Sequence, residues 1–250
     1  MAHIEFREPV RAILLDIEGT TTTIAFVHRT LFPFARARVA EYLARNRNDP
    51  RVIADLAMLR EEHAADALLG PPPLPEGSLD AAVAYLHWLM DRDRKSTPLK
   101  SLQGRIWEEG YRAGALKSEI FPDVPPALER WRAQERRVCI YSSGSVLAQR
   151  QLFAHTTAGD LTGALSAYFD TRIGPKREPA SYQRIAGQLS LPHDEILFLS
   201  DIAEELQAAH QAGFQTALSV RPGNAPQPTL PFAPEVAGFD EVFPVKHCPA

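Results

Sequence analysis

Acidic and hydroxyl side chains follow short apolar runs at three widely separated places in the chain. In chain order these side chains are Asp16, Glu18, Ser142, Ser143 and Asp201. Carboxylates bind divalent cations or act as nucleophiles, acids and bases. Hydroxyls and free N–H groups at the start of a helix bind anions. An open α/β sheet binds its ligands beyond the carboxyl ends of its strands, so we expect these groups to converge at one edge.

Each of these acids could also have a purely structural role. Asp16 can cap a turn with Glu18 on the surface, and Asp201 can be an ordinary helix N-cap. Residues i and i+2 of an extended chain point the same way, however, so Asp16 and Glu18 can divide the work of attack and proton transfer. Asp16 and Asp201, with waters and a substrate phosphate, form a plausible Mg²⁺ site. Helix-dipole complementarity is enough to explain Glu204 and Glu205.

Lys176 lies in a Gly-Pro loop just before a predicted helix. Most lysines are solvated surface residues, but this loop falls on the same side of the predicted sheet as the acids. A fixed ammonium there would offset the repulsion between a phosphate and a carboxylate nucleophile. The calcium-loop, P-loop, dinucleotide-binding and G-x-S-x-G motifs are all absent from the sequence. Together, the groups that remain predict phosphoryl transfer.

The elements that must position these groups alternate between strands and helices. Apolar runs predict strands at 11–16, 136–144, 195–201 and 214–220. Helical patterns follow at 145–155, 181–189 and 203–212. This alternation is typical of an α/β fold with a doubly wound parallel sheet.

Residues 24–118 have a different pattern, which is almost entirely helical. Helices are predicted from Phe32 toward Arg45, at 51–63, from Leu79 after a Ser78 N-cap, and at 99–112. Ile53, Leu56, Leu59 and Ile106 are the inward-facing candidates. We therefore expect a helical domain at 24–118, inserted into a core domain made of residues 1–23 and 119–250.

Composition excludes several functional classes. A net charge of −4 gives no reason to expect nucleic acid as a partner. The apolar runs are too short to span a membrane, and the N-terminus has no secretory h-region, so we expect a cytoplasmic protein. Cys139 lies in an apolar run and should be a buried thiol, and neither it nor Cys248 belongs to a metal or redox motif.

These motifs resemble those of the haloacid dehalogenase (HAD) superfamily of phosphohydrolases, with strand-DxxGT, strand-SSG, a loop lysine and strand-SD in the expected order. The sequence is more closely similar to the acireductone synthase family, the enolase-phosphatases of methionine salvage. LLDIEGTTT, IYSSGSV, FLSD and RPGN carry this resemblance, together with the segment around Lys176. They extend over almost the whole chain.

The resemblance implies a HAD-like, Rossmann-like sheet with an inserted all-helical cap domain. It implies a monomer with one Mg²⁺ per subunit. Asp16 would be the nucleophile and a Mg²⁺ ligand, Glu18 would contact the metal through its carbonyl, and Asp201 would be the third ligand. Because the Glu18 side chain is one methylene longer than that of the usual Asp, our own hypothesis is that it acts as the general acid and base. Ser142 and Ser143 would bind substrate oxygens, and Lys176 would hold the phosphate.

The implied substrate is 2,3-diketo-5-methylthiopentyl 1-phosphate, a phosphorylated diketone. Enolisation and dephosphorylation would give the acireductone 1,2-dihydroxy-5-methylthiopent-1-en-3-one, with the cap covering the methylthio tail. An alternative is a HAD phosphatase that acts on another small phosphate ester. A non-catalytic scaffold on the same fold is a further alternative, against which the presence of Asp16 argues.

Overall fold

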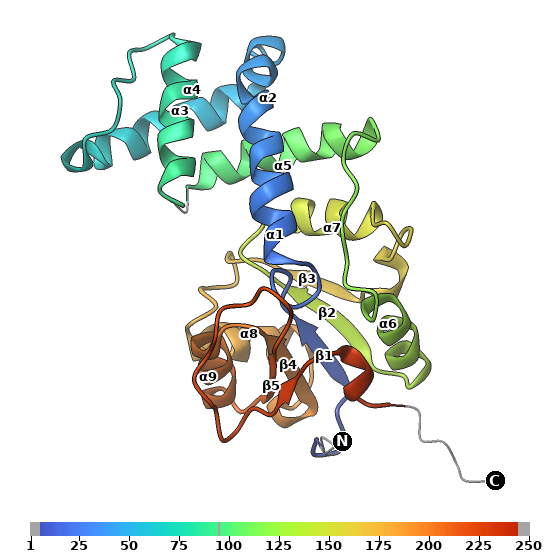
Figure 1. Cartoon of the computed structure of the whole chain (residues 1–250). Coiled ribbons are helices and arrows are strands. Elements are labelled where there is room, and N and C mark those ends of the chain that lie inside the picture. Colours follow the sequence, from blue (N-terminus) through green and yellow to red (C-terminus); the bar gives the residue numbers. More distant parts are fainter. Residues whose placement is uncertain (1–5, 95, 245–250) are drawn as a thin grey trace. The chain divides into compact units, whose positions relative to one another are not determined.

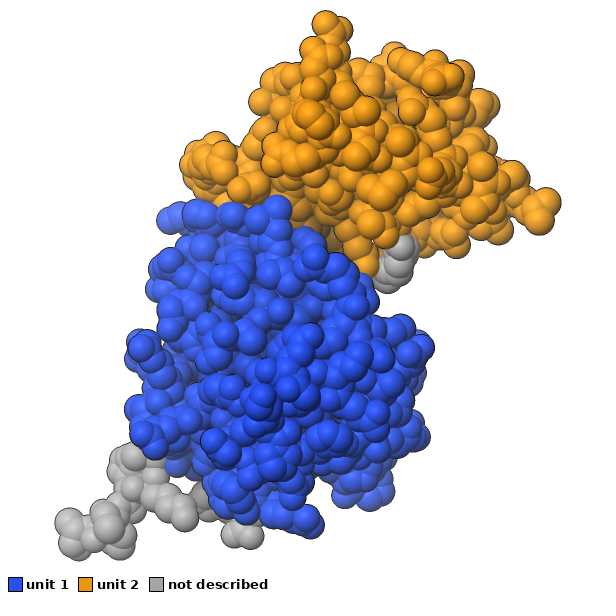
Figure 2. All heavy atoms as spheres, turned by 180° about the vertical axis from the view of Figure 1, so that it is seen from behind, with its two compact units in different colours: residues 1–27, 117–250 blue, residues 28–116 orange. Residues whose placement is uncertain are grey.

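A computed structural model describes residues 6–94 and 96–244 of the chain. The chain divides into two compact units, one of residues 1–27 and 117–250 and the other of residues 28–116 (Figure 2). Within the described ranges, no helix combines the length and the apolar character needed to cross a membrane.

The first unit is built on a six-stranded sheet in the order β3-β2-β1-β4-β5-β6, and all neighbouring strands are parallel (Figure 1). The strands are β1 (Ala12–Leu15), β2 (Arg137–Tyr141), β3 (Ala167–Phe169), β4 (Ile196–Ser200), β5 (Gln215–Ser219) and β6 (Glu235–Val236). Every residue of β1 and β4 is buried, which is why these strands are continuous apolar runs and do not alternate with polar residues. The predicted parallel sheet is confirmed.

Helices cover both faces of this sheet (Figure 1). They are α6 (Val124–Ala133), α7 (Val146–Ala154), α8 (Pro179–Leu189) and α9 (Ala203–Gln211), and a single turn, α1 (Ile24–Phe26), follows the loop after β1. On one face Leu14 and Cys139 pack with Tyr182 of α8 and Leu206 of α9, so Cys139 is a buried thiol as predicted. Cys248 lies outside the described residues. The doubly wound α/β class is thereby confirmed.

Strands β3 and β6 and helix α6 of the sheet unit were not predicted from the sequence. Strand β3 has only three residues, too few to stand out as an apolar run. Helix α6 begins with a Val-Pro-Pro sequence, and prolines in the first helical turn hide a helix from pattern analysis although they are tolerated there.

The regular elements in the described part of the second unit are all helices, joined by loops such as residues 70–78. A π-helical turn, Val27–Leu31, leads into α2 (Phe32–Arg45), α3 (Pro50–Ala65), α4 (Leu79–Asp91) and α5 (Thr97–Arg112). The predicted Ser78 cap is confirmed, because its hydroxyl accepts the amide of Ala81 at 3.2 Å. Ile53 was predicted to face inward, which is wrong, since it is 53% exposed. The buried stripe of α3 runs through Val52, Leu56 and Leu59, and Ile53 lies about 100° around the helix from Val52.

A buried ion pair joins three helices of this unit. Asp55 of α3 and Arg105 of α5 form a salt bridge with side chains 5% and 12% exposed. Arg105 Nε also donates to the hydroxyl of Tyr42 on α2 at 3.1 Å. Removing one partner of such a pair leaves the other charge buried without compensation.

We expect Asp55→Asn to lower the free energy of unfolding by about 3 kcal/mol, because Arg105 would stay buried without its counter-charge. The matched control is Asp91→Asn, which breaks the Arg36–Asp91 pair, whose side chains are 41% and 57% exposed. That exposed pair should contribute at most about 1 kcal/mol. Urea unfolding followed by circular dichroism measures both, and equal losses would contradict the assignment.

Candidate active site

Strand register brings the predicted site residues to one edge of the sheet. β1 lies between β2 and β4, with Leu15 opposite both Ile140 and Leu199. The amide of Asp16 continues the ladder by donating to the carbonyl of Leu199 at 3.0 Å. Strand order reverses at this point of the sheet, where α/β proteins bind ligands. Asp16, the loop after β2 and Asp201 therefore emerge side by side.

The chain turns sharply directly after Asp16. The amides of Thr20, Thr21 and Thr22 all donate to the carbonyl of Ile17, at 3.2, 2.8 and 3.0 Å. Gly19 has φ +69, a left-handed conformation that glycine adopts at no steric cost. Glu18 lies half-buried in this turn. Strand β1 itself ends at Leu15, and that Asp16 and Glu18 point the same way stays a prediction.

Hydroxyl support for this turn comes from Thr21 and Thr22. The buried hydroxyl of Thr20 has no hydrogen-bond partner within the described part of the chain. Thr21 donates to the carbonyls of Asp16 and Ile17 at 3.3 and 3.1 Å, and Thr22 donates to the carbonyl of Glu119. The geometry of the turn decides which threonine hydroxyls reach these carbonyls. A run of four threonines in the sequence does not reveal that geometry.

Side-chain hydroxyls hold the loop that carries Lys176. The carbonyls of Gly174, Pro175 and Lys176 accept hydrogen bonds from Tyr141, Ser181 and Tyr182, at 2.8, 2.7 and 2.7 Å. Three successive backbone acceptors are thus fixed to β2 and α8. The loop conformation, and with it the direction of the Lys176 side chain, is set by residues distant in sequence.

The ammonium of Lys176 is the centre of the site. It lies 2.6 Å from Asp16 Oδ1 and 2.5 Å from Glu205 Oε2, and the side chain is 8% exposed. Burial by itself lowers the pKa of Lys176, but the two carboxylates outweigh this effect and the pKa is raised. Lys176 therefore remains a fixed positive charge between two acids.

Glu205 is a site residue that the sequence interpretation missed. Helix-dipole complementarity was sufficient to explain it, yet its carboxylate contacts Lys176 and accepts a hydrogen bond from the Ser200 hydroxyl at 2.9 Å. Burial raises the pKa of Glu205, Lys176 lowers it, and Asp16 raises it again. The available signal was its place in the first turn of α9, where side chains lean toward the helix N-terminus and so toward the end of β4.

Asp201 is also buried and lies in a strongly negative environment. Burial, together with the charges of Asp16 and Glu205, raises the pKa of Asp201 to about 7, while Lys176 acts in the opposite direction. Three carboxylates thus face a single ammonium. This excess of buried anionic oxygen fits a hard divalent cation such as Mg²⁺.

The donor set suits a cation that keeps water and substrate oxygens in its shell. Across residues 6–94 and 96–244, no three His, Cys, Asp or Glu side chains are grouped so as to hold an ion by themselves. Mg²⁺ commonly uses one or two carboxylates plus waters and substrate phosphate, which is what Asp16 and Asp201 can provide.

Ser142 and Ser143 lie in the loop between β2 and α7. The amide of Ser142 donates to the carbonyl of Phe169 at 3.1 Å, and its hydroxyl accepts the amide of Gly144 at 3.2 Å. Ser143 is exposed. The buried amide of Gln149 holds this loop by donating to the carbonyls of Gly144 and Phe169, both at 2.8 Å. The loop precedes a helix N-terminus, so it can receive an anion.

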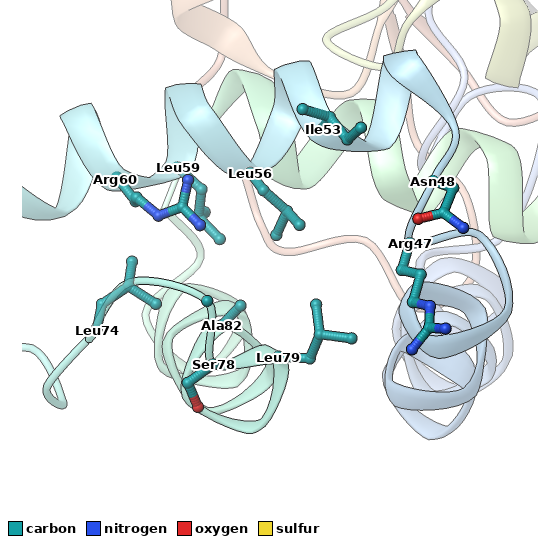
Figure 3. Close-up of a pocket in the computed structure, with 11 residues that line it drawn as sticks. Arg47, Asn48, Ile53, Leu56, Leu59, Arg60, Leu74, Ser78, Leu79 and Ala82 are labelled. Carbon is teal, nitrogen blue, oxygen red and sulfur yellow. The ribbon is translucent and has the colours of Figure 1, made fainter.

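A separate hollow of about 340 Å³ lies within the helical unit. Leu56 and Leu59 of α3 point toward Ala82 of α4, and Arg47 and Arg60 lie near opposite ends (Figure 3). None of the site residues predicted from the sequence lines it. The strand-end cluster is therefore the candidate active site.

The fold and this acidic site with its central lysine define a hydrolase of the haloacid dehalogenase-like class, whose family model matches residues 10–213. Enolase-phosphatase E1 of Synechococcus elongatus is 56% identical over 86% of this chain and 91% of its own length. The protein of the same name from Sorangium cellulosum is 50% identical over 87% of this chain and 90% of its own length. The chain therefore belongs to the haloacid dehalogenase-like hydrolases and, within them, to the enolase-phosphatase E1 family.

A solved structure has the same architecture. The UTR4 protein of Saccharomyces cerevisiae matches with a TM-score of 0.75 and 33% identity, over 93% of this chain and 99% of that chain. The agreement extends over both the sheet and the helical insertion. The protein is a phosphatase-type hydrolase.

We expect Gly19→Ala to reduce phosphatase activity about tenfold or more. A Cβ at Gly19 would lie 2.3 Å from Asp201 Oδ2, so the carboxylate would have to move. Gly159→Ala is the control, because Gly159 has φ +95 but no atom within 4 Å of the added Cβ. Released phosphate measures activity and thermal unfolding measures strain. An equal loss of activity in both variants would contradict the role of the Gly19–Asp201 contact.

Proposed function

We propose that the protein is an enolase-phosphatase of methionine salvage that converts 2,3-diketo-5-methylthiopentyl 1-phosphate into the acireductone and phosphate. The observation that carries this proposal is the buried Lys176 ammonium between Asp16 and Glu205, beside Asp201. The proposal is also supported by the 56% sequence identity between this chain and a relative named enolase-phosphatase E1. The substrate, the roles of individual residues and the metal are part of the proposal.

Phosphoryl transfer is assigned to Asp16. The oxygen of Asp16 that Lys176 does not contact attacks phosphorus, and the bond between phosphorus and the C1 oxygen breaks. Water then attacks phosphorus of the aspartyl phosphate, which releases phosphate and restores the carboxylate. Lys176 offsets the charge of the phosphate, and the loop of Ser142 and Ser143 binds its oxygens.

Proton transfer is assigned to Glu18. In enolisation it removes a proton from C1, and the C2 oxygen takes a proton from solvent. In dephosphorylation the protonated Glu18 gives its proton to the C1 oxygen as this oxygen leaves phosphorus. One side chain serves both half-reactions because both protons move at or beside C1.

Asp16, Asp201 and the carbonyl of Glu18 would hold one Mg²⁺ per subunit. When bound, Mg²⁺ supplies Lewis-acid polarisation of the diketone and neutralises phosphate charge. Glu205 also contacts the Lys176 ammonium and so helps to keep it in place.

The remaining assignments complete the proposal. We assign residues 24–118 to a cap domain, and we propose a monomeric, cytoplasmic enzyme without a nucleic-acid or membrane partner. The alternative, a phosphatase for another small phosphate ester, uses the same core groups. It is distinguished by comparing kcat/KM for the diketone phosphate with that for a small sugar phosphate.

Asp16→Asn should reduce phosphate release from the diketone phosphate by about 10⁴-fold or more, because the nucleophile is lost. Enol absorbance should decline less, since Glu18 is unchanged. Purified protein, Mg²⁺ and substrate suffice for the assay, with free phosphate and enol absorbance followed together. Phosphate release that is absent in the wild type, or unaffected by the substitution, would overturn the proposal.

Glu18→Gln should slow both half-reactions by about 10²- to 10⁴-fold, as expected for the loss of a general acid and base. Glu204→Gln is the matched control, because Glu204 is an exposed acid in the first turn of α9 and should have no effect. The same two signals report the result. Wild-type rates of enolisation and of phosphate release in Glu18→Gln would refute the role of Glu18.

A further inference from the structure

The segment Arg221-Pro222-Gly223-Asn224 follows β5 and has no role in the reaction described above. Its polar side chains nevertheless reach the turn after β1. Asn224 Nδ2 donates to the carbonyl of Gly19 at 2.9 Å and to that of Ser219 at 3.0 Å. Ser219 Oγ donates to the same Gly19 carbonyl at 3.3 Å, and Arg221 Nη2 donates to the carbonyl of Thr20 at 3.3 Å. Two successive carbonyls directly after Glu18 are therefore fixed by side chains of one segment.

Arg221 is itself held rigidly. Its side chain is 4% exposed and forms an ion pair with Asp123 at 2.8 Å. The guanidinium lies 4.6 Å from the ring centroids of both Phe121 and Phe239. Cation–π contacts and a buried ion pair leave this group little freedom, so it is a firm anchor for the turn.

The hydrogen bonds from this segment pass over the end of β4. Sheet order places β4 between β1 and β5, so Asn224 reaches Gly19 across the position where Asp201 emerges. A Cβ built on Gly19 would lie 2.3 Å from Asp201 Oδ2 and 3.0 Å from Asn224 Oδ1. The turn bearing Glu18, the Asp201 carboxylate and the Asn224 amide are thus packed against one another.

We propose that Asn224, assisted by Ser219 and Arg221, is a positioning residue that sets the distance between the Glu18–Gly19 turn and Asp201. Asn224 thereby sets the affinity of the site for its divalent cation. The inference rests on the proposed Mg²⁺ ligands Asp16, Glu18 and Asp201. Groups that orient metal ligands typically change metal affinity 10- to 100-fold when they are removed.

The test is direct binding of Mg²⁺ to the full chain, measured by isothermal titration calorimetry without substrate. Asn224→Ala should weaken Mg²⁺ binding about tenfold, and Asn224→Ala combined with Ser219→Ala should weaken it further. The matched control is Thr216→Val, which removes a buried β5 hydroxyl that donates to the carbonyl of Phe232 at 3.2 Å. At saturating Mg²⁺, KM for the diketone phosphate should be unchanged in all three variants.

Thermal unfolding separates positioning from general loss of stability. Mg²⁺ affinity that falls in the Asn224 variants but not in Thr216→Val, at similar melting temperatures, supports the inference. Wild-type affinity in Asn224→Ala and in the double variant, or equal weakening in Thr216→Val, would overturn it while leaving the proposed function intact. Absence of Mg²⁺ binding by the wild type would overturn the metal assignment and the inference together. A wild type that binds Mg²⁺ but leaves the diketone phosphate unchanged would count against the proposed function alone.

Discussion

The site depends on a single buried cation held between acids. Lys176 contacts Asp16 and Glu205 at 2.6 and 2.5 Å, and its desolvation is tolerated because both contacts are charge-assisted hydrogen bonds. With Asp201 added, negative charge exceeds positive charge. This excess explains the raised pKa of Asp201 and makes a divalent cation a suitable partner. Phosphate, which brings further negative charge, would depend on the same balance.

Such a cluster keeps its geometry only if the loops that carry it cannot drift. Both critical loops are fixed through their backbone carbonyls by side chains from other elements. Tyr141, Ser181 and Tyr182 hold the Lys176 loop, and Asn224 and Arg221 hold the turn after Asp16. A loop whose carbonyls are satisfied by buried donors loses hydrogen bonds if it moves, which makes its conformation expensive to change.

The sheet supplies the common frame for these loops. β1 and β4 are buried on both faces and adjacent, so the residues that follow them emerge next to each other where strand order reverses. The helical unit is stabilised separately, by its own buried stripe and by the Asp55–Arg105 pair. Each unit therefore has an independent physical basis for its fold.

The sequence alone determined the strands that carry Asp16, Ser142 and Asp201, because buried parallel strands form continuous apolar runs with polar residues at their ends. It also indicated Lys176 and the helical insertion. Only the tertiary structure decided that Glu205 faces Lys176 and that Glu18 lies within the turn from Ile17 to Thr22. The residues that fix these loops could not be identified from the sequence either. The hydrogen bond between Asn224 and Gly19, for example, joins residues 205 positions apart and leaves no local sequence pattern.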